Sequence, residues 1–192
     1  MDAQTWIILA AVVVLAVIAG LAWRVYQKEQ SQRLKAHFGP EYGRTVASLG
    51  SQSKAESELK SRETRVEHLK IVPLPAAEAA TFSQAWKALQ GRFVDNPKGV
   101  LAEADQLVRD LMVKRGYPMG DFDRRAADIS VDHPTVVEHY RAAQATALRD
   151  QRGQADTEEL RKGVVHYRAL FQELLGVTDT QTHDATHLEV HS

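Results

Sequence analysis

The chain has 192 residues, with 24 basic and 25 acidic side chains and a formal net charge of −1. A balance this close gives no global field that would collect a polyanion, so nucleic acid is not an expected partner. The chain has no cysteine, which excludes disulfides, thiolate metal sites and cysteine nucleophiles.

An apolar segment near the N-terminus predicts a membrane anchor. Residues 7–22 carry no charged and no strongly polar side chain. As a helix, the span from Trp6 to Trp23 covers roughly 27 Å, close to the ~30 Å hydrocarbon core of a bilayer. Trp6, Trp23 and Tyr26 stand where an aromatic belt contacts the membrane interface. We therefore expect a transmembrane helix over residues 6–26, with the lipid bilayer as its partner.

The charges on either side of this segment predict its orientation. Residues 1–5 form a short flank without Lys or Arg, whereas four basic residues follow the anchor: Arg24, Lys28, Arg33 and Lys35. Cytoplasmic flanks are enriched in Lys and Arg, so we expect a single-pass cell-membrane protein with a cytoplasmic C-terminal domain. The exported side is the alternative. A cleaved signal peptide is the rival interpretation, but its basic n-region and a good cleavage site are missing.

Residues 27–72 predict a juxtamembrane helix, a glycine-rich elbow and a charged stalk helix. Gly39 and Pro40 end the first helix, and residues 39–50 form either a turn or a short broken helix. Residues 51–70 carry opposite charges at helical i,i+4 spacing, which is typical of an exposed helix. The apolar stripe of this helix is thin: Ala55, Leu59, Val66 and Leu69. It indicates a solvated stalk or, alternatively, a weak coiled-coil seam between two copies.

Residues 73–176 predict an antiparallel bundle of four amphipathic helices, because apolar residues recur there at spacings of three and four. The predicted helices begin at Pro75, Pro97, Pro134 and Asp156. A loop of about seventeen residues joins the second and third helices and is longer than most helical connections. Residues 122–129 of this loop could form a short helix of their own. Residues 177–192 are polar, and we expect them to be disordered. The expected fold class is all-α.

A short motif occurs twice, 27 residues apart. Val137-Glu138-His139-Tyr140-Arg141-Ala142 resembles Val164-Val165-His166-Tyr167-Arg168-Ala169. If the two helices are antiparallel neighbours, the tyrosines meet in the core and the His and Arg side chains lie on the flanks. This pattern indicates either a paired His and Arg site for an anion or a metal ion, or two boundary tyrosines with solvated neighbours.

The long loop also contains oxygen and nitrogen donors that suit a divalent metal ion: Asp121, Asp123, Asp128, Asp132 and His133. The spacing is not that of an EF-hand. Aspartates also cap helices and stabilise turns, and this structural role is the competing interpretation. These five residues are therefore weak metal candidates.

The C-terminal residues contain three histidines four positions apart, His183, His187 and His191, which would align on one face of a helix. No apolar stripe enforces a helix there. A phosphate-binding glycine loop, a Gly-x-Ser-x-Gly elbow, a His-Glu-x-x-His motif and a Rossmann fingerprint are all missing from the sequence. We therefore expect no cofactor, and these motifs give no support to an enzymatic activity, which the sequence leaves open.

Several segments together resemble an uncharacterised bacterial family of single-anchor helical proteins, described as hypothetical membrane or secreted proteins. These segments are residues 38–42, 92–97, 104–108, 115–118, 130–134, 157–161 and 166–168. The chain has Gly43 where members often have Asp. The resemblance implies an anchor, a helical bundle and a bacterial source, and it implies no catalytic residues.

The leading functional hypothesis is a membrane-tethered, non-enzymatic helical module that contacts another protein or a second copy of itself. Ala16 and Gly20 form a small-xxx-small pair that would let two anchors pack closely. The alternative hypothesis is a small-molecule or divalent-metal-binding domain. It would use the loop from Asp121 to His133 together with His139 or His166.

Overall fold

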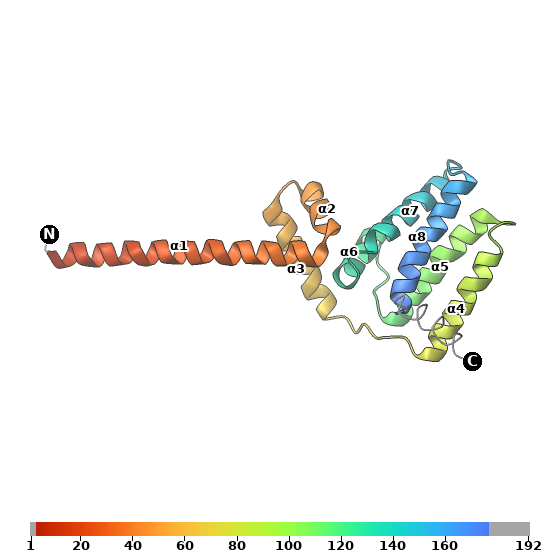
Figure 1. The fold of residues 1–192 in the computed structure, drawn as a ribbon, viewed down its shortest axis with the longest axis horizontal. Coiled ribbons are helices and arrows are strands. Elements are labelled where there is room, and N and C mark those ends of the chain that lie inside the picture. The colour runs from red at the N-terminus through yellow and green to blue at the C-terminus, as the bar shows by residue number, and fades with distance from the viewer. Residues whose placement is uncertain (1–2, 177–192) are drawn as a thin grey trace, which may run out of the picture. The chain divides into compact units, whose positions relative to one another are not determined.

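The computed structural model describes residues 3–176, without the side chains of residues 3–11 and 13. Within this range the protein is all-α, with eight helices and no strand (Figure 1). The all-α prediction is therefore confirmed. The chain divides into two compact units, residues 1–59 and residues 60–192. The predicted disordered segment, residues 177–192, lies outside the described residues.

The first unit contains α1 (Ala3–Phe38), α2 (Pro40–Leu49) and the beginning of α3 (Gln52–Glu67). The helix α1 ends before Gly39, as predicted, because Gly39 has a φ of 49° and Pro40 opens the next helix. The predicted elbow is thus a short helix, α2, which lies beside the C-terminal end of α1 (Figure 1). The buried apolar residues of the first unit are Leu34, Phe38, Tyr42, Ala55 and Leu59.

Among the residues that the structure describes, no helix combines the length and the apolar character needed to cross a membrane. The predicted anchor, residues 6–26, includes residues 6–11 and 13, whose side chains the structure does not describe. The anchor therefore stays a prediction.

The charged helix α3 differs from the prediction of a solvated stalk. In the first unit, the side chains of Ala55 and Leu59 are fully buried, and in the second unit Val66 is buried as well. The thin apolar stripe is therefore core, and this helix is not a free stalk.

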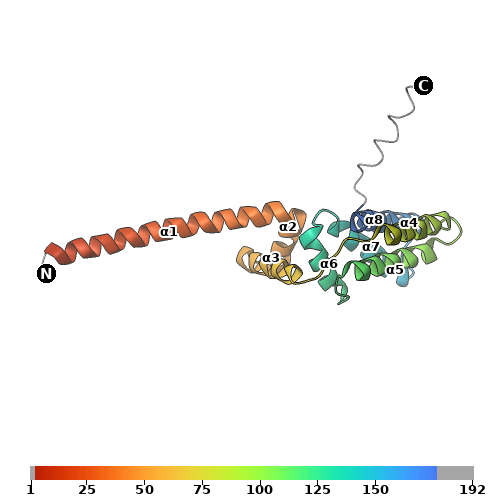
Figure 2. The same ribbon diagram turned by 90° about the horizontal axis from the view of Figure 1, so that it is seen from below.

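The second unit is built on four bundle helices: α4 (Ala76–Gly91), α5 (Pro97–Arg115), α7 (Val137–Gln151) and α8 (Thr157–Leu175). Figure 2 shows them side by side, with α6 (Phe122–Asp132) next to α7. The short connections make α4 antiparallel to α5, and α7 antiparallel to α8. Most of the core consists of the apolar residues on these helices, from Trp86 and Leu89 on α4 to Phe171 and Leu174 on α8.

Local signals place the helix starts. The Asn96 side chain accepts a hydrogen bond from the Gly99 N–H at 3.0 Å and caps α5. Asp156 and Glu159 form the predicted capping box of α8. The third bundle helix begins at Val137 and not at Pro134, because the residues between them form a turn.

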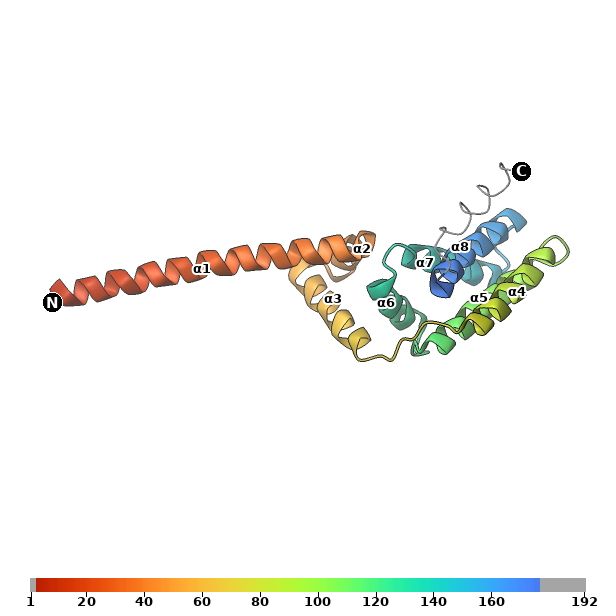
Figure 3. The ribbon, with the colours of Figure 1, turned by 60° about the horizontal axis from the view of Figure 1, so that its bottom comes forward.

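The linker before α4 lies along the C-terminal end of α5 (Figure 3). The Val72 N–H donates to the Arg115 carbonyl oxygen at 2.9 Å. Next to this contact, Gly116 has a φ of 92°, and a Cβ there would lie 2.4 Å from the Lys70 carbonyl oxygen. Only glycine fits at this position, which lets the linker close against the bundle.

Candidate functional site

The two tyrosines of the repeated motif meet inside the bundle. Tyr140 on α7 and Tyr167 on α8 are both fully buried, and their ring centroids lie 6.5 Å apart. The prediction that these residues meet in the core is confirmed. Each hydroxyl group reaches a different polar cluster at the edge of the core.

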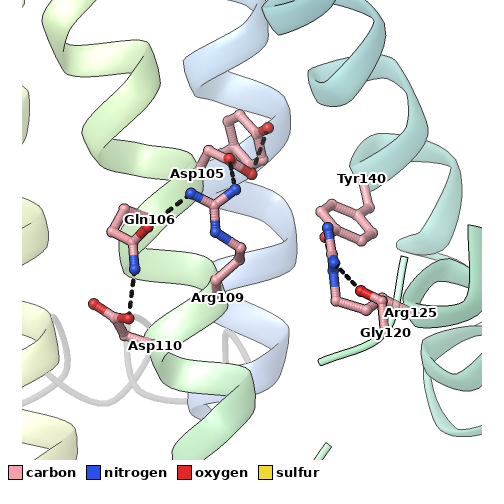
Figure 4. A network of polar contacts seen from close by, with 8 residues as sticks. Asp105, Gln106, Arg109, Asp110, Gly120, Arg125 and Tyr140 are labelled. Atoms are coloured by element: carbon pink, nitrogen blue, oxygen red, sulfur yellow. Dashed lines mark hydrogen bonds and ion pairs between the residues drawn. The ribbon is translucent and has the colours of Figure 1, made fainter. Parts of the chain in front are cut away.

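The Tyr167 hydroxyl belongs to a cluster on α5. It donates to Asp105 Oδ1 at 2.9 Å, and the other carboxylate oxygen of Asp105 pairs with Arg109. Arg109 also donates to Gln106 Oε1 at 2.7 Å, as Figure 4 shows. The side chain of Asp105 is 14% exposed, so its charge is neutralised close to the core.

The Tyr140 hydroxyl belongs to a second cluster, on α6 and the loop before it. Arg125 Nε donates to this hydroxyl oxygen at 3.0 Å, and Arg125 Nη1 donates to the Gly120 carbonyl oxygen at 2.5 Å (Figure 4). The Phe122 ring packs 4.8 Å from the Tyr140 ring, measured between centroids. The two clusters together connect α5, α6, α7 and α8.

Burial sets the protonation state of both tyrosines. It raises the pKa of Tyr167 far above the ordinary value, and the neighbouring Asp105 charge raises it further. Burial also raises the pKa of Tyr140, although the hydrogen bond from Arg125 acts in the opposite direction. Both phenols are therefore neutral hydrogen-bonding groups at physiological pH, and neither is poised as a base or a nucleophile.

The histidines of the repeated motif also meet, on the surface of the α7–α8 hairpin. His139 Nδ1 lies 2.9 Å from His166 Nδ1. The two arginines of the motif do not join them: Arg141 lies 3.8 Å from an oxygen of Asp123, and Arg168 lines a different hollow of the bundle. The structure thus assembles the histidine pair of the predicted site, without its arginines.

The five metal candidates do not form a joint site. The first three have separate positions: Asp121 caps α6 by accepting from the Arg124 N–H at 2.7 Å, Asp123 is exposed, and Asp128 is buried against Arg65. Asp132 accepts from the Tyr117 hydroxyl at 3.0 Å, and His133 Nδ1 lies 3.0 Å from Glu173 Oε1. Across residues 3–176, no three His, Asp or Glu side chains are placed to hold a metal ion. His183, His187 and His191 lie outside the described residues.

The contact between Asp128 and Arg65 was not expected from the sequence. Asp128 is 1% exposed, and its Oδ1 accepts from Arg65 Nε at 2.7 Å. Burial of a carboxylate requires such a counter-charge. The burial of Asp128 could have been suspected from the sequence, because its neighbours along the chain, Ala126, Ala127 and Ile129, are apolar. Its partner could not be inferred, because Arg65 is 63 residues away on another helix.

A second buried carboxylate was also missed, in the first unit. Glu56 Oε1 accepts hydrogen bonds from Ser31 Oγ at 2.7 Å, Tyr42 Oη at 2.8 Å and Gln52 Nε2 at 2.8 Å. Burial and the Glu56 contact raise the pKa of Tyr42 to about 12. Glu56 lies at the edge of a polar cleft of about 510 Å³ that also includes Lys28 and Lys35. The sequence predicts an exposed Glu56, because Glu56 and Lys60 have the i,i+4 spacing of charges on a solvated helix face. This prediction is wrong, since Glu56 is buried.

Two of the three predicted belt residues are described. Trp23 and Tyr26 are both more than half exposed, and their ring centroids lie 6.4 Å apart. The side chain of Trp6 lies outside the described residues.

Comparisons with protein-family models, with characterised proteins and with solved structures found no match to this chain. The resemblance to a bacterial family of single-anchor proteins stays a prediction.

Proposed function

We propose that this chain is a single-pass membrane protein whose non-enzymatic helical bundle contacts another protein. The observation that carries this proposal is a continuous apolar surface on α1. Nine large apolar side chains there are each more than half exposed: Val12, Val14, Leu15, Val17, Ile18, Leu21, Trp23, Val25 and Tyr26. Burying one such side chain gains about 1.5–3 kcal/mol, so a surface of this size favours an apolar environment.

The distribution of these nine side chains favours lipid over a single partner helix. At 100° per residue they cover about two thirds of the circumference of α1, whereas a protein groove covers one face. The interfacial charges lie at the C-terminal end of this segment: Arg24 is next to Trp23, and Lys28, Arg33 and Lys35 follow Tyr26. These charges support a cytoplasmic position for residues 27–192.

The hollow between α4 and α8 is the surface that best fits a protein contact. Its volume is about 170 Å³, and the stacked rings of Trp86 and Phe171 form part of its wall, 4.7 Å apart between centroids. Polar side chains surround these rings: Ser83, Lys87, Gln90, Arg168 and Gln172. The two rings are 5% and 2% exposed, so the accessible part of this surface is its polar rim with Arg168. Arginine is among the residues that most often dominate binding at protein interfaces.

Membrane extraction and crosslinking in native membranes test the two parts of this proposal. We expect the protein to stay in the membrane pellet after carbonate extraction. A photo-crosslinker at Lys87, on the rim of the hollow, should capture another protein or a second copy, whereas the same group at Arg161, an exposed position on α8 that is not part of the hollow, should not. Release by carbonate would disprove the tether. A Lys87 crosslinking pattern identical to that of Arg161 would disprove the contact surface.

A further inference from the structure

Two imidazole rings face each other on the surface of the α7–α8 hairpin. His139 and His166 come from different helices, and their Nδ1 atoms lie 2.9 Å apart. Their ring centroids are 5.1 Å apart, with the ring planes inclined by 33°. At this separation one Nδ1 carries a hydrogen atom and the other presents a lone pair, because two protonated nitrogens would repel each other.

The His166 ring is suited to bind a metal ion near neutral pH. Partial burial lowers the pKa of His166, and the nearby His139 lowers it further. The neutral imidazole, which is the form that binds metals, is therefore favoured. His139 is exposed, so a metal ion can reach the pair from solvent.

We propose that His139 and His166 form a two-histidine site for a divalent transition-metal ion, with Cu²⁺ preferred. Imidazole nitrogens suit Cu²⁺, Ni²⁺ and Zn²⁺, and Cu²⁺ binds such ligands most tightly in the divalent series. The ion would bridge α7 and α8. Water would complete its coordination, because no third His, Asp or Glu of the described residues is placed to do so.

The distance between the two nitrogens is compatible with a tetragonal ion. Two nitrogens bound about 2.0 Å from a metal in neighbouring square-planar positions lie about 2.8 Å apart, whereas a tetrahedral ion separates them by about 3.3 Å. The observed 2.9 Å is closer to the first arrangement. Binding requires each ring to turn so that both Nδ1 lone pairs face the ion. The ring with hydrogen on Nδ1 changes to the Nε2–H tautomer, so no proton is lost overall.

A copper titration of the full-length chain in detergent micelles tests this site. All proteins in the test would carry His183→Gln, His187→Gln and His191→Gln, so that these three C-terminal histidines cannot bind the added ion. Titration with Cu²⁺ in a buffer that does not coordinate the ion should give one tightly bound ion per chain. Electron paramagnetic resonance of that complex should show two equatorial imidazole nitrogens.

Single substitutions then assign the ligands. Either His139→Gln or His166→Gln should weaken Cu²⁺ binding roughly a hundredfold, because one imidazole no longer chelates with the other. The matched control is His68→Gln, since His68 is an exposed histidine just after α3 whose Nδ1 lies near the Thr64 carbonyl oxygen and not near another histidine. This control should bind Cu²⁺ like the parent.

Two results would overturn the proposal. One is a paramagnetic spectrum of the parent that shows a single coordinated nitrogen. This result does not depend on whether the substituted proteins fold, because it is measured on the parent alone. The other is equal Cu²⁺ affinity for the parent, His139→Gln and His166→Gln, with circular dichroism showing that all three are folded. A titration in which Zn²⁺ binds more tightly than Cu²⁺ would contradict the preference for Cu²⁺.

Discussion

The ion pair between Arg65 and Asp128 is a buried contact of the second unit. Asp128 is 1% exposed, and two guanidinium nitrogens of Arg65 lie 2.7 Å from its Oδ1. Removal of one partner of a buried pair leaves the other charge without compensation in a medium of low dielectric constant. The stability of this unit therefore depends on a residue that lies outside the bundle helices.

We predict that Arg65→Met lowers the free energy of unfolding by about 3–5 kcal/mol. The double variant Arg65→Met with Asp128→Leu should recover most of this loss, because the unpaired carboxylate is gone. Urea unfolding followed by circular dichroism measures both. Arg161→Met is the control, since Arg161 pairs with Glu158 in full contact with solvent, and it should leave the midpoint unchanged. Equal midpoints for Arg65→Met and the parent would contradict the prediction.

The histidine pair predicts how stability depends on pH. The pKa of His166 is lower in the folded state, first because of burial and then because of His139, so the unfolded chain binds protons more readily. The contribution of His166 to stability is present above the ordinary histidine pKa of about 6.5 and is lost as pH falls through the lower folded value. Stability should therefore decrease on acidification.

The His166→Gln variant isolates this effect. Its unfolding midpoint should fall less between about pH 7 and pH 5 than that of the parent, because one group that resists protonation is missing. Thermal unfolding in a series of buffers measures the difference. His139→Gln should also reduce the slope, since it removes the second cause of the shift. An identical slope in the parent and in His166→Gln would contradict the prediction.

The sequence predicted which residues of the repeated motif are buried, but not what their polar atoms contact. Helical spacing places Tyr140 and Tyr167 on the core face, and it is sufficient for that purpose. The partner of Tyr167 is Asp105, 62 residues earlier in the chain, and no local pattern connects them. Two aspartates of the predicted metal loop were misassigned for the same reason, because Asp123 and Asp128 have partners on other helices, Arg141 and Arg65.

At the level of helices, close packing around α8 opposes the replacement of Gly163 by alanine, although helix propensity favours that replacement. Gly163 is buried in the middle of α8, and a Cβ there would lie 2.8 Å from Leu101 Cδ1 and 2.9 Å from Thr146 Cγ2. Glycine therefore lets α8 approach α5 and α7 closely. The cost of glycine in a helix interior, about 1 kcal/mol, is offset by this packing.

We predict that Gly163→Ala destabilises the second unit by about 1–2 kcal/mol despite the higher helix propensity of alanine, because overpacking costs more than the propensity gains. Gly91→Ala is the matched control in the same unit. Nothing lies within 4 Å of a Cβ at Gly91, so this change should be neutral or slightly stabilising. Differential scanning calorimetry compares them. A higher melting temperature for Gly163→Ala would contradict the prediction.

Helix boundaries followed from local chemistry, while the surroundings of each helix did not. Asn96, Asp156 and the glycines after α5 and α8 mark their helix ends in the sequence alone. The helix α3 was expected to be an exposed stalk because its stripe is thin, yet Ala55 and Leu59 are fully buried. The spacing of apolar residues along one helix shows which face can be buried, and it does not show which other residues cover that face.

At the level of the whole chain, the division into units differs from the predicted domain boundaries. The bundle was expected to begin at residue 73, whereas the second compact unit begins at residue 60. The additional residues include Arg65, which compensates Asp128, and Val66, which is 6% exposed. A fragment that starts at the predicted boundary lacks both.

We predict that a fragment of residues 73–192 is less stable than a fragment of residues 60–192, by about 3–5 kcal/mol, because Asp128 is left without its counter-charge. Urea unfolding of the two purified fragments measures this difference. Asp128→Leu in the shorter fragment should restore part of the stability. If the two fragments unfold at the same urea concentration, residues 60–72 contribute nothing to the second unit.

The stacking of Trp86 on Phe171 also gives the bundle an intrinsic optical probe. The chain has three tryptophans, and Trp86 is the one that lies in the second unit, 5% exposed. Replacement of Trp6 and Trp23 by phenylalanine would leave a single emitter between α4 and α8. The wavelength of its fluorescence would then report, without any attached dye, whether these two helices separate when a protein docks beside them.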